Sequence, residues 1–179
     1  VYIMSLHLRV GPMHSGKTTQ LIKDYITFKQ DGKKVCIMNW KGDIERTKTE
    51  FLKSHDNIMV ECLNIDSFDD VELVKQFQKN DYDIYMLNEG QFFKDLRKTT
   101  IYIVEQLKRD FYIYALDGDS NRETFGEIHY LYPLCDTIEK LNALCSCGKK
   151  ALFSKRLVDD ERQILIGTDI YKSVCRACY

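Results

Sequence analysis

The sequence has little of several features that would mark a special class of protein. It has two prolines in 179 residues, and its 26 basic and 27 acidic residues leave a formal net charge of −1. No apolar run approaches the roughly 20 residues that span a bilayer, so no membrane partner is expected. The near balance of charge gives no general attraction to nucleic acid, which disfavours a duplex-DNA-binding protein. Residues 1–10 lack the basic start and the cleavage site of a secretory signal, so we expect a cytoplasmic location.

What is present is the composition of an ordinary globular protein, with 44% hydrophobic and 30% charged residues. The length suits one full hydrophobic core and a small appendage. Cysteine is the exception, because seven residues are many for such a chain. Three are isolated in apolar stretches and are expected to be small buried hydrophobes, namely Cys36, Cys62 and Cys135. The other four form two close pairs near the end, which in a cytoplasmic protein indicates metal before disulfide.

Hydrophobic periodicity predicts strands that alternate with helices. Strands are expected to end at Val10 and to cover residues 35–40, 58–63, 83–87 and 111–116. Helices are expected over 18–30, around Val71–Phe77 and over 96–109, and the polar stretch 41–57 is expected to be a long loop. This alternation is typical of an α/β fold with a parallel sheet and flanking helices. We expect a nucleotide-binding α/β domain over 1–143 and a small lobe over 144–179.

Residues 11–18 match the phosphate-binding pattern G-x-x-x-x-G-K-[ST] at every fixed position. They lie between a predicted strand and a predicted helix, which is the context that this motif requires. The glycines Gly11 and Gly16 let backbone N–H groups turn toward a phosphate, while Lys17 is expected to reach the terminal phosphates and Thr18 to ligate Mg²⁺. The remaining loop residues are Pro12, Met13, His14 and Ser15. We expect His14 to fill a position in the loop without a catalytic role.

A phosphate-binding loop does not by itself name a reaction, since ATPases, GTPases and kinases all use one. The predicted strand 83–87 delivers Asn88, Glu89 and Gln91 to the carboxyl edge of the sheet, beside this loop. A carboxylate there can accept the proton of an attacking hydroxyl. The alternative is that Glu89 is a solvated charge at a strand end.

Four segments, in order, make the chain resemble the type II thymidine kinases. GPMHSGKTTQL is similar to the family motif G-P-M-F-S-G-K-[ST]-x-E-L, and NEGQFF is similar to D-E-[GA]-Q-F-F. ALDGDSNRETFG is similar to A-L-D-G-x-F-x-R-x-x-F, and SKRL followed by GTDIYKSVCRACY is similar to the family's ending. The resemblance covers nearly the whole chain. It implies a P-loop sheet with a C-terminal zinc-ribbon lobe that carries a lasso loop.

The resemblance also implies roles for individual residues. Glu89 would be the general base toward the 5′-hydroxyl of thymidine, giving dTMP for DNA synthesis. Asp43, Arg46, Asn88 and Gln91 would contact ATP and its Mg²⁺. Apolar side chains and lasso backbone would hold the base, through Met13, Phe92, Leu116, Ser120, Phe125, Gln163, Ile164, Leu165, Ile166, Gly167 and Tyr171. The family further implies a homotetramer and feedback inhibition by dTTP.

The two cysteine pairs predict a structural four-thiolate Zn²⁺ site formed by Cys145, Cys147, Cys175 and Cys178. The alternative is four unliganded thiols. The sequence departs from the family pattern at three places. Asn88 stands where the motif has Asp, Ser120 where it has Phe, and the first cysteine pair is one residue closer together.

These departures leave a second hypothesis open, a weakly active or inactive relative that binds nucleotide. A third, a nucleic-acid-binding zinc-ribbon module, is disfavoured by the neutral charge and the complete phosphate loop.

Overall fold

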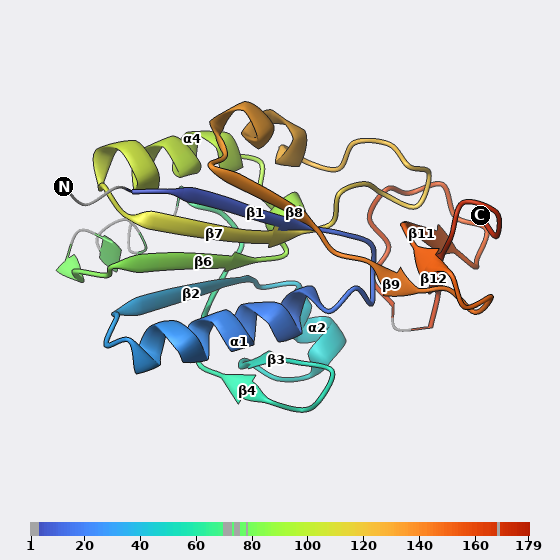
Figure 1. The fold of residues 1–179 in the computed structure, drawn as a ribbon, viewed down its shortest axis with the longest axis horizontal. Helices are drawn as coiled ribbons and strands as arrows, with labels where there is room; N and C mark the ends of the chain where they lie inside the picture. Colours follow the sequence, from blue (N-terminus) through green and yellow to red (C-terminus); the bar gives the residue numbers. More distant parts are fainter. Residues whose placement is uncertain (1–3, 70–72, 74–75, 78, 168) are drawn as a thin grey trace.

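A six-stranded parallel sheet forms the centre of the computed structural model, which describes residues 4–69, 73, 76–77, 79–167 and 169–179. The strand order is β5-β2-β6-β7-β1-β8, and each neighbouring pair is parallel (Figure 1). The strands are β1 (Leu6–Val10), β2 (Val35–Trp40), β5 (Leu63–Ile65), β6 (Ile84–Asn88), β7 (Asp110–Ala115) and β8 (Thr137–Lys140). The predicted α/β class is therefore confirmed.

The two faces of the sheet are covered by different helices because side chains alternate along each strand. One face carries Leu8 and Leu87 and packs against α4 (Leu96–Ile101) and its continuation, the π-helix η2 (Tyr102–Gln106). The opposite face carries Ile37 and Met86 and packs against Leu21 and Ile22 of α1 (Lys17–Gln30). Figure 1 shows α1 and α4 on opposite sides of the strands. Both faces are thus buried, as a parallel sheet requires.

The long periodic segments form the elements that the sequence predicts. The strand that ends at Val10, the helix over 18–30 and the strand over 35–40 are confirmed, and those over 83–87 and 111–116 are confirmed within one residue. The helix around Val71–Phe77 is described only at residues 73, 76, 77 and 79, which are helical, while Val71 and Val74 lie outside the described residues. The helix over 96–109 stops at Gln106. No helix in the described part of the chain is long and apolar enough to cross a membrane.

The prediction of an irregular loop over 41–57 is wrong. It contains the helix α2 (Asp43–Thr47) and the strand β3 (Leu52–Lys53). Asp43 is buried and pairs with Arg46 one turn later, which supports the short helix. Leu52 is fully buried among the residues under α1, and that burial holds the segment against the sheet. Tertiary packing therefore overrides the polar composition of this stretch.

The single strand predicted over 58–63 is also wrong. The structure forms β4 (Met59–Val60), antiparallel to β3, and the separate strand β5 in the main sheet. The last sheet strand, β8, was not predicted, because all four of its side chains are exposed and give no hydrophobic alternation. It follows the 3₁₀ helix η3 (Ile128–Leu134) and is fixed where the Leu6 N–H donates to Asp136 Oδ2 at 2.7 Å.

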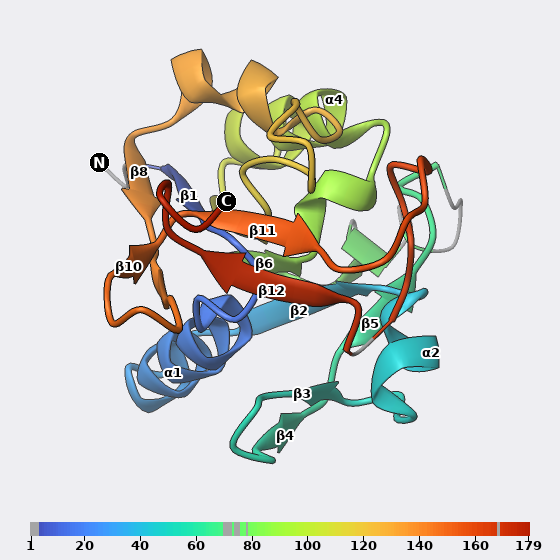
Figure 2. The same ribbon diagram turned by 90° about the vertical axis from the view of Figure 1, so that its right-hand side faces the viewer.

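Two short antiparallel pairs form the C-terminal lobe. β9 (Ala143–Leu144) pairs with β10 (Lys150–Ala151), and β11 (Phe153–Arg156) pairs with β12 (Tyr171–Val174). In Figure 2 these strands face the viewer, beyond one end of the sheet. Their small core consists of Cys145, Ala151, Val174 and Cys175. The boundary expected at 143–144 falls within β9.

The three isolated cysteines differ in their surroundings. Cys36 is buried, as predicted, and burial raises the pKa of its thiol to about 12. Cys62 and Cys135 are only half-buried, so the prediction of full burial is wrong for both. The Cys62 thiol donates to the Glu50 carbonyl oxygen at 3.4 Å.

Candidate active site

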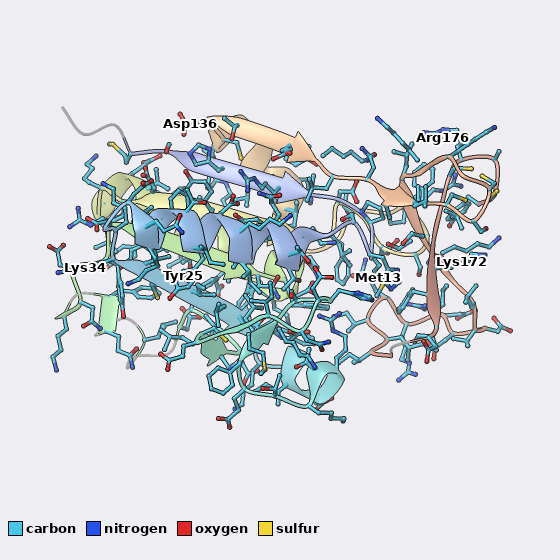
Figure 3. The ribbon with its side chains drawn as sticks, turned by 60° about the horizontal axis from the view of Figure 1, so that its bottom comes forward. Met13, Tyr25, Lys34, Asp136, Lys172 and Arg176 are labelled. Carbon is cyan, nitrogen blue, oxygen red and sulfur yellow. The ribbon has the colours of Figure 1, made fainter. Side chains whose placement is uncertain are left out.

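A cavity of about 570 Å³ opens at the carboxyl end of the sheet, between the phosphate loop and the C-terminal lobe. Strands β2, β6 and β7 each deliver a connecting segment to its wall, as parallel sheets do at their carboxyl edge. In Figure 3, Met13 lies at the end of the molecule that carries the C-terminal lobe, and Lys34 lies at the opposite end. The loop between β11 and β12 closes the remaining side.

The phosphate loop between β1 and α1 has the backbone that its sequence requires. Gly16 has φ of 81°, in the left-handed region that favours glycine, directly before α1 begins at Lys17. The Lys17 ammonium donates to the carbonyl oxygens of Gly11 at 3.1 Å and Pro12 at 2.8 Å. Burial lowers the pKa of Lys17 to about 8, and Glu89 opposes that shift. A buried ammonium held only by neutral oxygens is ready to pair with a phosphate.

Glu89 lies at the end of β6 with φ of 57°, a left-handed conformation that is uncommon outside glycine. Its two carboxylate oxygens have different partners. Oε1 lies 3.4 Å from Nη2 of Arg46, and Oε2 accepts a hydrogen bond of 2.6 Å from Nε2 of Gln91. The side-chain oxygen Oε1 of Gln91 in turn accepts from the Leu116 N–H at 2.9 Å. The carboxylate is therefore oriented from two sides, yet each oxygen keeps a lone pair for a further proton.

The arginine that approaches Glu89 belongs to a second carboxylate pair in α2. The Nε of Arg46 donates to Asp43 Oδ1 at 2.8 Å, and its Nη2 contacts the same oxygen. Burial raises the pKa of Asp43, while Arg46 acts in the opposite direction. Asp43 and Arg46 therefore face the same cavity as Glu89, although they lie more than 40 residues away in sequence.

Asn88 takes a position different from that of its neighbour Glu89. It is only 2% exposed and does not line the cavity. Its amide donates to Asn39 Oδ1 at 2.8 Å, and the Asn39 amide donates to Asp43 Oδ2 at 3.3 Å. Asn88 thus contacts the cavity wall through Asn39 and Asp43. Gly11 and Pro12 are likewise buried beneath the lining.

Aromatic rings form one wall of the cavity. Trp40 and Phe92 are stacked with 3.8 Å between ring centroids, and Phe125 meets Phe92 edge-on at 5.4 Å. Leu116 and Met13 continue this apolar wall. This wall is aromatic and apolar, which suits a planar ring with few polar atoms.

The loop over 157–170 is held against this wall by one buried guanidinium. Arg156 Nη1 donates to the carbonyl oxygens of Asp160 at 2.5 Å and Arg162 at 2.6 Å. Its Nη2 donates to the Gln163 carbonyl oxygen at 3.1 Å and to the Tyr171 hydroxyl at 2.9 Å. That hydroxyl donates to the Leu165 carbonyl oxygen, also at 2.9 Å. A single side chain therefore sets the course of the loop.

A separate contact ties the tip of this loop to the segment after β7. Gln163 Nε2 donates to Asp119 Oδ2 at 2.8 Å, and the buried Asp119 also accepts the N–H groups of Asn121 and Glu123. Ser120 is buried beside it, and its carbonyl oxygen accepts the Tyr179 hydroxyl at 2.6 Å.

Four cysteine sulfurs gather in the C-terminal lobe. The Sγ atoms of Cys145, Cys147, Cys175 and Cys178 all lie within 4.8 Å of one another, with 3.6 Å between those of Cys147 and Cys175. Backbone N–H groups of Cys147 and Cys175 lower the pKa of Cys145 to about 6, which favours a thiolate. Sulfurs at this spacing fit one tetrahedral Zn²⁺ with bonds of about 2.3 Å. The residues therefore suit a closed structural zinc site.

Comparison with known proteins decides the family of this fold and site. The family model described as thymidine kinase matches residues 4–179. This chain belongs to the thymidine kinase family.

Three thymidine kinase relatives match over most of their own length. The thymidine kinase of Myxoma virus (strain Uriarra) is 34% identical over 100% of this chain and 98% of its own. The thymidine kinase of Sheeppox virus (strain KS-1) is 36% identical over 97% of this chain and 96% of its own. Thymidine kinase 1 of Dictyostelium discoideum is 35% identical over 94% of this chain and 74% of its own. Among solved structures, a DNA replication initiation factor reaches a TM-score of 0.46 at 14% identity over 78% of this chain and 40% of its own, too low a similarity to indicate a shared function.

The structure brings most of the residues that sequence reasoning assigned to the thymidine kinase site to one cavity. Those that line it are Met13, His14, Ser15, Gly16, Lys17, Thr18, Asp43, Arg46, Glu89, Gln91, Phe92, Leu116, Ser120, Phe125, Gln163, Ile164, Leu165, Ile166, Gly167 and Tyr171. Sequence reasoning missed other lining residues, among them Trp40, His55, Asp119 and Ser154. Trp40 could have been found, because it ends a predicted strand at the same edge as Glu89.

Proposed function

We propose that this protein transfers the γ-phosphoryl group of ATP to the 5′-hydroxyl of thymidine, giving ADP and dTMP. The observation that carries the proposal is the placement of Glu89 between a complete phosphate loop and an aromatic pocket in one cavity. Membership of the thymidine kinase family supports the substrate, since the viral and Dictyostelium relatives are named for it.

Glu89 accepts the proton of the 5′-hydroxyl as the oxygen attacks the γ-phosphorus. The bond from that phosphorus to the bridging oxygen then breaks, and ADP leaves with the electron pair. Arg46 and Gln91 hold the carboxylate in place for this transfer. Lys17 leaves its carbonyl partners to neutralise the phosphates.

Mg²⁺ fits the same cavity, because the Thr18 hydroxyl and the Asp43 carboxylate supply the oxygen ligands that it prefers. When bound, it would neutralise charge on the β- and γ-phosphates. Trp40, Phe92 and Phe125 would enclose the base, and the loop over 157–170 would read its polar edge with backbone groups. Zn²⁺ would hold the four thiolates of the C-terminal lobe.

The test is an assay of purified protein with Mg²⁺-ATP and a panel of nucleosides, with the monophosphate products resolved. Thymidine should react faster than deoxycytidine or purine deoxynucleosides, because an apolar aromatic wall suits a 5-methyl pyrimidine. Equal rates across the panel, or product only from a purine nucleoside, would contradict the substrate assignment.

A second candidate, a nucleotide-binding relative with little turnover, is favoured by one observation. Asn88 gives the end of β6 a neutral amide where the family motif has a carboxylate. ATP binding without any nucleoside monophosphate would support it.

The proposal extends to assembly, regulation and location. A homotetramer should appear by mass photometry, and dTTP should compete with thymidine in the kinase assay. The four cysteine thiols of the C-terminal lobe stay reduced in a reducing compartment, so we place the activity in the cytoplasm.

A further inference from the structure

His14 is the residue of the phosphate loop whose side chain ordinarily changes charge near neutral pH. It stands where the family motif has phenylalanine. Its backbone has φ of 59°, and its exposed side chain lines the cavity together with those of Lys17 and Thr18. Nothing in the proposed phosphoryl transfer uses this imidazole.

Hydrogen bonds from the C-terminal lobe define which ring nitrogen of His14 carries a proton. The Ser173 hydroxyl donates to the Met13 carbonyl oxygen at 2.5 Å, and this uses its single hydrogen. The same oxygen lies 3.1 Å from Nδ1 of His14, so it must accept there. Nδ1 therefore bears a hydrogen whether the ring is neutral or charged.

Ser173 has little freedom to reverse this arrangement. It is 6% exposed and lies opposite Ser154 in the β11–β12 pair. Ser154 is equally buried, and its hydroxyl oxygen accepts the Met13 N–H at 2.9 Å. The two serines hold both sides of Met13, which fixes the loop next to His14. Nε2 is consequently the nitrogen of His14 that gains or loses a proton.

The groups that act on His14 come from the end of its own loop and from two other segments. They are Lys17 at the start of α1, Arg46 in α2 and His55 after β3, and each is basic. Of the carboxylates that line the cavity with His14, Glu89 and Asp43 are paired with Arg46, and Asp119 accepts a hydrogen bond from Gln163. Asp169, in the loop between β11 and β12, also lines it. Partial desolvation, followed by Lys17, His55 and Arg46, lowers the pKa of His14. In the free protein near neutral pH, the His14 ring is therefore neutral and Nε2 carries a lone pair. The basic side chains around it favour binding of an anion.

We propose that His14 is a proton-linked phosphate contact: binding of a nucleoside triphosphate draws a proton onto Nε2, which then donates to a phosphate oxygen. The inference rests on the proposed ATP site. A polyphosphate offsets the three neighbouring cations and favours the charged ring. The pKa of His14 is then higher in the complex than in the free protein. Protonated His14 therefore adds its full contribution to the affinity for the nucleoside triphosphate at pH values below the pKa of the free protein. That contribution is lost as pH rises through the pKa of the complex.

The experiment is calorimetric titration of wild type and His14→Phe with ATP at several values from pH 5.5 to 7.5, below the pKa of Lys17. Each titration is repeated in two buffers with different heats of ionisation, which reports protons taken up on binding. ATP itself titrates in this range, but equally for both proteins, so the difference belongs to His14. Wild type should take up more protons on binding ATP than the variant does. As pH falls, the ATP affinity of wild type should rise relative to that of the variant by up to about tenfold. A tenfold gain corresponds to a rise of about one unit in the pKa of His14 on binding.

A second measurement needs no nucleotide. The ¹⁵N shifts of the His14 ring should show a neutral tautomer with hydrogen on Nδ1 in wild type and a mixture of tautomers in Ser173→Ala. Equal proton uptake by wild type and His14→Phe would overturn the proposal, and so would a wild-type tautomer with hydrogen on Nε2. Failure of wild type to bind ATP would instead overturn the nucleotide site on which the proposal rests.

Discussion

Glu89 and its neighbours show how much of the site a sequence contains at the scale of single residues. The sequence around Glu89 predicts that this residue lies at the carboxyl edge of the sheet. In the structure it lines the same cavity as the phosphate loop. The contacts to Arg46 and Gln91 could not be deduced, because they depend on how α2 packs. Asn88 ends β6 and is buried behind Asn39, whereas Glu89 follows the strand with a left-handed backbone and lines the cavity.

Glu89→Gln should retain ATP binding and lose about 10²–10⁴-fold in turnover, because an amide cannot accept the hydroxyl proton. The amide keeps the shape of the side chain and an oxygen for Gln91 or Arg46. The measurements are the initial rate of dTMP formation and the ATP affinity. A variant that turns over at nearly the wild-type rate would show that Glu89 is not the base.

Asn88→Asp should act in two measurable ways. A buried carboxylate would face the Asn39 oxygen that now accepts from Asn88, so the free energy of unfolding should fall by about 1–3 kcal/mol in denaturant titrations without metal. The added negative charge should also lower the Mg²⁺ concentration required for half-maximal activity. An unchanged Mg²⁺ dependence would show that position 88 does not influence the metal.

At the scale of elements, the sequence predicts those parts whose own periodicity is strong. Helix α1 is predictable because it buries one helical face, and strands β2 and β6 because each is a short, almost continuous apolar run. Helix α2 could not be predicted, since four of its five residues are polar and it is held by the ion pair between Arg46 and the buried Asp43. Strand β8 has no buried face, and only pairing with β1 defines it.

The loop over 157–170 yields a prediction about its central arginine. Arg156→Lys should raise the KM for thymidine about tenfold and leave the ATP affinity unchanged, because a lysine cannot bridge four oxygens in a plane. Arg162→Lys is the matched control in the same loop, since Arg162 makes an exposed ion pair with Asp160. Equal effects of the two substitutions on thymidine KM would mean that Arg156 does not position the loop.

At the scale of the whole molecule, the C-terminal lobe and the parallel sheet share one cavity, and the four-cysteine cluster lies in that lobe. We expect zinc at this cluster to support the lobe. Purified protein should contain about one zinc per chain. Cys175→Ser should lower the free energy of unfolding by about 4 kcal/mol or more, as loss of a structural metal does. It should also weaken ATP binding, because Ser173 reaches Met13 from the same strand end.

Cys62→Ser is the control for this substitution, since Cys62 is half-buried and far from the four sulfurs in sequence. Elemental analysis and denaturant unfolding give the two readouts. Folded, active wild-type protein without zinc would contradict the structural role of the metal.

The position of β1 also sets the order of events when the chain is made. Both neighbours of β1 come from much later in the sequence, with Leu6 opposite Phe111 in β7 and His7 opposite Thr137 in β8. On a ribosome, the first strand therefore waits for more than a hundred residues before either partner emerges. Such distant pairing slows folding and leaves the early chain exposed to chaperones. The phosphate loop, which follows β1 directly, therefore reaches its final shape only after β7 and β8 have been made.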